Sequence, residues 1–213
     1  ISRAKKLIRL CAKAGADAAK FQHFKAETII SPLGFKELGK KSHQSQWKKS
    51  VFETYKDASI NFEWTKILKK ECKKNNIDFM TSPYDLEYVD MVEKYVSAYK
   101  IGSGDLNWHS IIKKISKKKK PIILATGAST LKEVKDTVKL ITKANEDLIL
   151  MQCNTNYSND EKNFENINLN VLKTYKKIFG NKVILGLSDH TSGHATVLGA
   201  ISLGARVIEK HFT

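Results

Sequence analysis

Short apolar runs alternate with amphipathic stretches along the whole chain of 213 residues, and this alternation is the strongest constraint on its fold. Continuous apolar runs of this length are typical of strands buried on both faces, which pair in parallel. The stretches between them, such as 86–95 and 130–144, carry apolar residues at helical spacing. Strand–helix alternation of this regularity predicts an α/β fold. The predicted strands lie within 17–23, 77–84, 98–105, 121–129, 148–157, 183–191 and 206–213.

The order of the elements favours a TIM (β/α)8 barrel. The chain starts with a helical pattern at 2–16 that has no strand before it, and it ends on a strand with no helix after it. One added strand and one added helix would complete eight of each, near the usual size of about 250 residues. Residues 1–213 are therefore expected to form a partial barrel, strand 2 to strand 8, without its first strand and last helix. A doubly wound open sheet is the alternative, but no Gly-x-Gly-x-x-Gly motif follows the first strand.

The segment 24–63 is too long for a simple connection between two of these elements. It is expected to be an insertion at the carboxyl end of a strand, with a short helix around residues 47–55. Insertions at that position are usually functional, as a lid or rim.

The composition is strongly basic, with 37 Lys and Arg against 22 Asp and Glu and a formal net charge of +15. This balance predicts an anionic partner. A lysine-rich nucleic-acid-binding module is the non-enzyme alternative, but nearly all the cations are lysines spread along the chain, whereas arginine is the residue that forks onto phosphates and guanines. Most of the lysines are expected to lie on solvated helix faces. The arginines are Arg3, Arg9 and Arg206.

Neither a membrane span nor a disulfide framework is expected. No apolar run approaches the roughly 18 residues that a transmembrane helix needs. The three cysteines, Cys11, Cys72 and Cys153, are widely spaced and form no Cys-x-x-Cys pair. Free thiols in a reducing cytoplasm are therefore expected.

Polar residues gather where the predicted strands end, which is where the active site of such a barrel lies. Residues two apart on a strand share a face, so Ser188 points with His190, and Glu209 with His211. These pairs are expected to face the polar mouth of the barrel, because a charge facing the helices would be costly to bury. The polar residues at the predicted strand ends are Lys20, Gln22, His23, Thr81, Ser82, Lys100, Ser103, Asp105, Thr126, Gln152, Asn154, Thr155, Tyr157, Ser188, Asp189, His190, Glu209, Lys210 and His211.

Two kinds of binding site are compatible with these residues. His190 and His211 end consecutive strands and are a plausible half of a divalent metal site that a carboxylate would complete; a metal-free pair of hydrogen-bonded histidines is the alternative. Lys20 and Lys100 are anion-binding candidates, with hydroxyl groups and the Gly102–Gly104 backbone to complete a phosphate and carboxylate cradle. A simple turn is the alternative at Gly102–Gly104.

Six motifs follow one another along the chain: KFQ, SPYD, AYKIGSGD, ILATGAS, GLSDHTSGH and IEKHFT. Together they resemble the barrel domain of the N-acetylneuraminate synthase family, whose members make sialic, legionaminic and pseudaminic acids. The resemblance implies condensation of phosphoenolpyruvate with an N-acetylated amino sugar, such as N-acetylmannosamine, to give a nine-carbon 2-keto acid and phosphate. It also implies a homodimer and a C-terminal antifreeze-like domain, which is expected to be absent from this chain.

The resemblance assigns roles to individual residues. Manganese or magnesium would be bound by His190 and His211, the sugar would contact Gln22 and Asp105, and Tyr157 would lie between the two substrates. Lys20, Lys100 and Tyr157 would be catalytic. Further substrate-binding residues would be Ser82, Ser103, Thr126, Thr155 and Ser188.

Three departures from the family pattern concern the substrates. Asp105 stands where Glu is frequent, Ala125 stands where a serine is common, and the segment around Thr155 differs from the usual one. These changes leave the reaction class standing and bear on the identity of the sugar. A related aldol synthase that makes 3-deoxy-octulosonate or heptulosonate phosphates is the alternative enzyme. Such enzymes need an Arg-rich site for a sugar phosphate, and this chain has few arginines.

Overall fold

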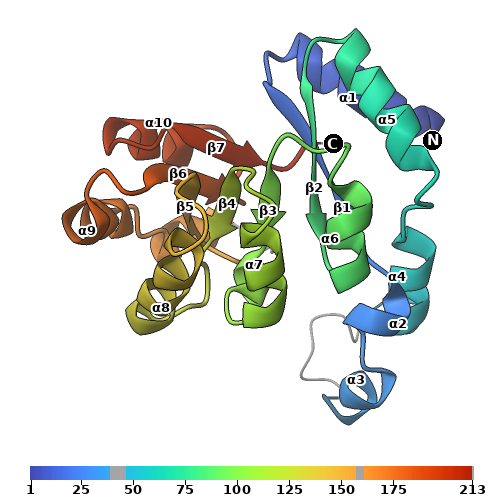
Figure 1. Cartoon of the computed structure of the whole chain (residues 1–213), viewed down its shortest axis with the longest axis horizontal. Coiled ribbons are helices and arrows are strands. Elements are labelled where there is room, and N and C mark those ends of the chain that lie inside the picture. The colour runs from blue at the N-terminus through green and yellow to red at the C-terminus, as the bar shows by residue number, and fades with distance from the viewer. Residues whose placement is uncertain (39–46, 157–160, 213) are drawn as a thin grey trace. The chain divides into compact units, whose positions relative to one another are not determined.

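The computed structural model describes residues 1–38, 47–156 and 161–212, and the chain divides into two compact units, Ile1–Val96 and Ser97–Thr213. Each unit has its own parallel strands and its own helices (Figure 1). The α/β prediction is confirmed, and each of the seven predicted strands is present among the described residues.

The first unit is built on two parallel strands, β1 (Ala18–His23) and β2 (Asp78–Pro83). Helices α1 (Ser2–Lys13) and α5 (Trp64–Lys74) pack together and onto these strands. The apolar residues buried in this packing are Ile8 of α1 and Leu68 and Cys72 of α5, which lie at the helical spacing of an amphipathic face. Helix α6 (Leu86–Val92) follows β2.

Three short helices lie in the predicted insertion, α2 (Ala26–Ile29), α3 (Pro32–Leu38) and α4 (Val51–Ala58). The predicted short helix is confirmed as α4, whose first turn is fixed by a reciprocal capping box between Ser50 and Glu53. Helices α2 and α3 were not predicted from the sequence. A role of the insertion as a lid or rim remains a prediction.

The second unit contains five parallel strands that pair in chain order: β3 (Tyr99–Ile101), β4 (Ile122–Ala125), β5 (Leu148–Cys153), β6 (Ile184–Asp189) and β7 (Val207–Lys210). All residues of β3 and β4 are buried, as expected for strands covered on both faces. The connecting segments are α7 (His109–Ser116), α8 (Leu131–Thr142), α9 (Asn170–Phe179) and α10 (Ala195–Ser202), with two 3-10 helices, η3 (Ser103–Asp105) and η4 (Glu161–Asn166).

Parallel strands that alternate with helices along the chain are those expected of a (β/α)8 barrel. The absence of the barrel's first strand and last helix, and a single partial-barrel domain over 1–213, remain predictions. Among the residues that the structure describes, no helix combines the length and the apolarity that a membrane span requires.

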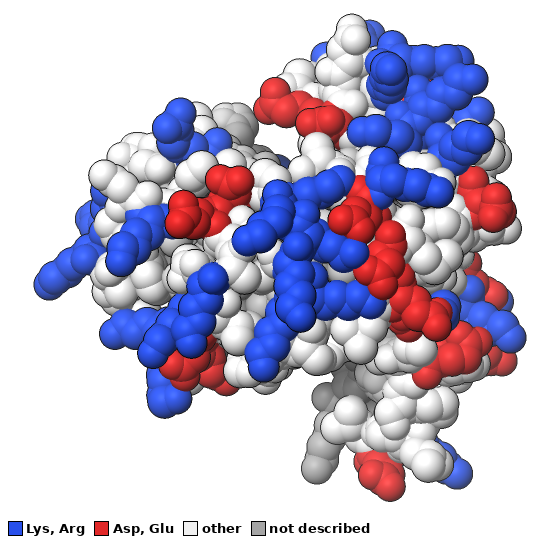
Figure 2. Space-filling view, viewed as in Figure 1, with Lys and Arg blue, Asp and Glu red and all other residues white. Residues whose placement is uncertain are grey.

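Lysine side chains lie largely on exposed helix faces, as predicted. Helices α1 and α5 each carry five Lys or Arg residues, and Figure 2 shows basic side chains gathered over them. Within this pair, the Arg9 Nε donates to Glu71 Oε1 at 2.7 Å, and the ion pair lowers the pKa of the Glu71 carboxyl. We assign no function to the other Lys and Arg side chains of these two helices.

Candidate active site

A buried ammonium group lies at the centre of the candidate site in the second unit. The Lys100 side chain is 3% exposed, and its Nζ lies 3.6 Å from Glu209 Oε1. Lys100 and Glu209 belong to the first and last strands of this unit's sheet, so their contact brings opposite ends of the sheet together. A buried cation is costly without a counter-charge, and Glu209 supplies one.

Ser188 joins the same cluster from β6. It lies directly beside Glu209 in the strand register, and its Oγ donates a hydrogen bond of 3.0 Å to Glu209 Oε1. Strand alternation predicted that Ser188 shares a face with His190, and Glu209 with His211. Lys100 contacts Glu209 on this same face. An ammonium and a hydroxyl converging on one carboxylate can also converge on the anionic group of a ligand.

The two histidines predicted as neighbours lie next to each other. The ring centroids of His190 and His211 are 5.0 Å apart. His190 Nδ1 lies 2.8 Å from the carbonyl oxygen of Asn154, which can only accept, so Nδ1 carries the proton and Nε2 has the lone pair. Burial, and secondarily the neighbouring His211, lower the pKa of His190, which favours the neutral imidazole.

A neutral imidazole with its second nitrogen held by a carbonyl is the state that binds metal ions. In the described parts of the chain, no three His, Cys, Asp or Glu side chains form a group that could hold a metal ion. The donor chemistry of His190 and His211 therefore fits two positions of a metal site, and other ligands would have to complete it.

Three connecting segments meet at Gly127. The Gly127 N–H donates to Ser103 Oγ at 2.9 Å. A Cβ at Gly127 would lie 2.5 Å from the Thr155 methyl carbon and 3.1 Å from the Cys153 carbonyl oxygen. The backbone thus approaches closely only because residue 127 has no side chain. This contact holds Ser103, after β3, and Thr155, after β5, against the end of β4.

Asp105 lies on η3, two residues after Ser103. Burial raises the pKa of its carboxyl to about 6, although the charge of Lys100 acts in the opposite direction. Near neutral pH, a carboxyl group with such a pKa can accept a hydrogen bond from a hydroxyl ligand when it is ionised, or donate one when it is protonated.

Thr126 is placed apart from this cluster. Its Oγ1 donates to the Met151 carbonyl oxygen at 2.8 Å and lies 2.8 Å from the hydroxyl of Tyr175, which comes from α9. These bonds direct the Thr126 side chain to the helix layer, so they give no support to its predicted contact with substrate. Tyr157 lies outside the described residues.

The first unit carries the other predicted residues. Gln22 and Ser82 are register partners on β1 and β2, and Lys20 is the partner of Met80. Gln22 Nε2 donates to the Tyr84 hydroxyl at 3.3 Å. Ser82 is 1% exposed, and its Oγ has no hydrogen-bond partner among the described residues. A buried hydroxyl without a partner calls for an explanation, and a ligand is one. Tyr84 was not predicted as a site residue from the sequence, although it lies in the SPYD motif.

His23 is buried beside this pair and has two partners that the sequence did not reveal. Its ring nitrogens lie 2.8 Å from Thr81 Oγ1 and 2.8 Å from Thr65 Oγ1. Burial lowers the pKa of His23 to about 4. His23 is therefore a neutral core residue at physiological pH.

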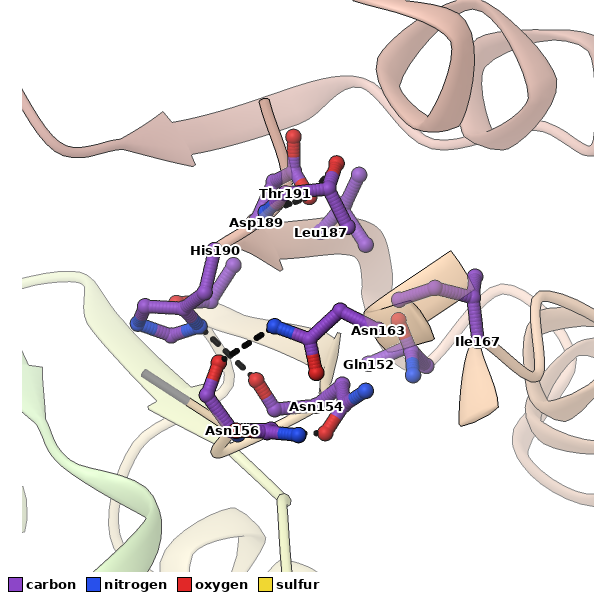
Figure 3. A pocket seen from close by; sticks show the side chains of 10 residues that line it. Gln152, Asn154, Asn156, Asn163, Ile167, Leu187, Asp189, His190 and Thr191 are labelled. Atoms are coloured by element: carbon purple, nitrogen blue, oxygen red, sulfur yellow. Dashed lines mark hydrogen bonds between the residues drawn. The ribbon is translucent and has the colours of Figure 1, made fainter. Parts of the chain in front are cut away.

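A hollow lined by amide side chains borders His190, between β5, β6 and η4 (Figure 3). The side chains around it leave essentially no room for a water molecule. Three buried amide atoms there, Gln152 Oε1, Asn154 Nδ2 and Asn163 Oδ1, have no partner among the described residues. Asn163 Nδ2 donates to the Asn156 carbonyl oxygen at 3.0 Å, which ties η4 to the segment after β5.

Comparison with known proteins agrees with these features. The chain is 37% identical over 211 residues to an uncharacterised protein of Methanocaldococcus jannaschii, covering 98% of this chain and 57% of that protein. It is 36% identical over 217 residues to N,N'-diacetyllegionaminic acid synthase of Campylobacter jejuni, covering 100% of this chain and 63% of the synthase. The chain thus spans about three fifths of the length of these relatives.

A solved structure matches nearly the whole chain. The N-acetylneuraminic acid synthetase of Leptospira borgpetersenii, crystallised with citrate, superposes with a TM-score of 0.82 at 26% identity, covering 99% of this chain and 67% of that one. The model of the NeuB family matches residues 7–213. The chain therefore belongs to the NeuB family.

Proposed function

We propose that the full-length protein condenses phosphoenolpyruvate with an N-acetylated amino sugar resembling N-acetylmannosamine, and releases a nine-carbon 2-keto sugar acid and phosphate. The observation that carries the proposal is the Lys100–Glu209–Ser188 cluster beside the His190–His211 pair, in a chain of the NeuB family. The reaction is proposed for the whole protein, because the chain spans only part of its relatives.

Phosphoenolpyruvate is an anion, and the proposal assigns it to cationic and hydroxyl groups. In the second unit, the Lys100 ammonium and the hydroxyls of Ser103 and Ser188 bind its phosphate and carboxylate. Lys20 and Ser82, which belong to the first unit, are assigned to phosphoenolpyruvate by the family resemblance, and the Ser82 hydroxyl has no hydrogen-bond partner among the described residues. Glu209 holds Lys100 and Ser188 in place before the substrate binds.

The amino sugar is assigned to the remaining polar groups. Gln22 and Asp105 bind its hydroxyl or amide groups, Thr155 contributes from the segment after β5, and Tyr157 lies between the substrates. Thr126 is not part of this assignment, because its hydroxyl is bonded to Tyr175. The proposal does not fix which amino sugar is used.

His190 and His211 would hold a divalent metal ion. Imidazole ligands favour Mn²⁺ over Mg²⁺, which prefers oxygen ligands. When bound, the ion acts as a Lewis acid toward the aldehyde oxygen of the open-chain sugar. The Asn154 carbonyl keeps the His190 proton on Nδ1 and so aims Nε2 at the ion.

The bond changes follow from the two substrates. C3 of phosphoenolpyruvate forms a bond to the aldehyde carbon of the sugar, whose oxygen takes up a proton and becomes a hydroxyl. Water adds to C2 and loses a proton, and the C2–O bond to phosphate breaks. Lys20 and Lys100 hold the phosphoenolpyruvate in line with the aldehyde, and this positioning is where much of the rate enhancement would come from.

The His190→Ala and His211→Ala variants of the full-length protein test the proposal. Each is expected to lose at least about 100-fold in Mn²⁺-dependent phosphate release from phosphoenolpyruvate and N-acetylmannosamine, because each removes one metal ligand. His109→Ala, which alters an exposed histidine on α7, is the matched control and is expected to retain activity. Normal activity and metal dependence in both site variants would refute the metal assignment.

A further inference from the structure

The strands that lead to His190 and His211 carry an ion pair on their opposite face, in which the carboxylate is buried and the lysine side chain is 34% exposed. Asp189 on β6 and Lys210 on β7 are register partners, and Lys210 Nζ lies 2.5 Å from Asp189 Oδ2. The Asp189 side chain is fully buried. Because side chains alternate along a strand, this pair faces away from Ser188 and Glu209.

The ion pair also fixes the backbone on the far side of His190. Lys210 Nζ donates to the Thr191 carbonyl oxygen at 2.6 Å. The Thr191 N–H and Oγ1 donate to Asp189 Oδ1 at 3.0 and 2.8 Å. Lys210 thus contacts the residues immediately before and after His190, and it immediately precedes His211. Thr191 Oγ1 also lies 3.1 Å from Thr196 Oγ1, which connects the network to α10.

The position of the pair within the strands is informative. One step earlier on the same face, the register partners are Leu187 and Ile208, an apolar pair. A buried ion pair is seldom more stabilising than an apolar pair of similar size, and its best-attested benefit is a fixed register. The change from an apolar to an ionic pair occurs beside the two histidines.

We propose that Asp189 and Lys210 are positioning residues, which lock the ends of β6 and β7 together so that His190 and His211 are preformed as a pair of metal ligands. The inference rests on the metal assignment of the proposed function and extends it to two residues that touch neither the metal nor the substrates. Outer residues that orient metal ligands typically change metal affinity by 10- to 100-fold when they are mutated.

The test is Mn²⁺ binding to the full-length protein without substrates, followed by the electron paramagnetic resonance signal of free Mn²⁺. Lys210→Met is expected to weaken binding by about 10- to 100-fold. Lys210→Arg, which keeps the charge and the donors, is expected to recover most of the affinity. Lys132→Met, which removes the exposed pair with Asp136, is the matched control and is expected to bind normally.

Asp189→Asn provides a second variant if Lys210→Met does not fold, because the amide keeps an oxygen for the Thr191 donors. It is expected to weaken Mn²⁺ binding in the same direction. Circular dichroism would establish that each variant is folded. Folded Lys210→Met or Asp189→Asn protein that binds Mn²⁺ as tightly as the wild type, while His190→Ala does not, would overturn the positioning role.

A metal-free readout separates this inference from the metal assignment. The imidazole resonances of His190 and His211 are expected to shift in Lys210→Met and to stay unchanged in Lys132→Met. Unchanged resonances in folded Lys210→Met would overturn the positioning role. Normal Mn²⁺ binding by His190→Ala and His211→Ala would instead overturn the metal assignment, and shifted resonances would then still support the coupling between the ion pair and the histidines.

Discussion

Lys100 and Glu209 show how individual side chains connect the fold to its chemistry. A lysine that is 3% exposed needs a negative partner, and Glu209 provides it in the absence of ligand. An incoming phosphoenolpyruvate would supply further negative charge at the same ammonium group. The proposal therefore gives Lys100 two partners, Glu209 in the free site and the anionic substrate when it is bound.

Lys100→Met is expected to weaken phosphoenolpyruvate binding because it removes a desolvated cation from the site. The loss should be about 2 kcal/mol or more, which corresponds to roughly 30-fold in Kd. The variant should still fold, since Glu209 is 23% exposed and keeps its bond to Ser188. Titration calorimetry of the full-length protein, with Lys132→Met as the control, measures the effect; an unchanged Kd would contradict the assignment of Lys100.

His23 makes a prediction about acid stability. The folded protein lowers its pKa from 6.5 to about 4, so between these values the unfolded chain binds a proton that the folded chain does not. Stability is therefore fully present above about pH 6.5 and falls as the pH drops toward 4. The total loss of stability from this group is about 3 kcal/mol, from the difference between the two pKa values.

Urea unfolding between pH 4 and 7 measures this loss. His23→Gln, whose side chain does not titrate, is expected to be less stable than the wild type at neutral pH, because it loses one of two buried hydrogen bonds. The stability difference between the two proteins should shrink as the pH falls. A difference that stays constant would show that His23 is not held neutral.

Single residues were predictable from the sequence where strand alternation alone decided their position. The approach of His190 to His211 follows from their places at the ends of consecutive strands, and it is confirmed. The bond between Thr126 and Tyr175 joins residues 49 positions apart, so strand alternation could not reveal it. The partners of His23 were hidden for the same reason, because Thr65 lies on α5 and Thr81 on β2.

At the scale of elements, the candidate site depends on how connecting segments pack after the strands. Gly127 is the point where the segments after β3, β4 and β5 come into contact. Helix α8 begins with a reciprocal capping box between Thr130 and Glu133, whose Thr-x-x-Glu spacing is visible in the sequence. Such local signals are readable from sequence, whereas the close approach at Gly127 depends on three segments at once.

Gly127→Ala is expected to destabilise the protein by about 1–3 kcal/mol, because the added methyl would overlap the Thr155 methyl group and backbone atoms that cannot move away. Gly104→Ala is the matched control, since a Cβ there would meet no atom within 4 Å. Chemical denaturation of both variants measures the difference. Equal stabilities would show that the segments are not tightly packed around residue 127.

At the scale of the whole molecule, the alternation of strands and helices was enough to predict an α/β chain with parallel strands, and the structure confirms it. The insertion was predictable from its length, but α2 and α3 were not, because they are too short to show a periodic pattern. The net charge of +15 did not by itself identify a partner; the placement of Lys100 beside Ser188 and Glu209 gives one of the cations a specific role.

The most direct test of the central claim is the reaction of the full-length protein with phosphoenolpyruvate and Mn²⁺ over a panel of sugars. The account predicts that N-acetylmannosamine or another N-acetylated amino sugar gives equal amounts of phosphate and a nine-carbon 2-keto acid, identified by mass spectrometry. It predicts no reaction with arabinose 5-phosphate. Turnover of arabinose 5-phosphate without turnover of any N-acetylated sugar would contradict it.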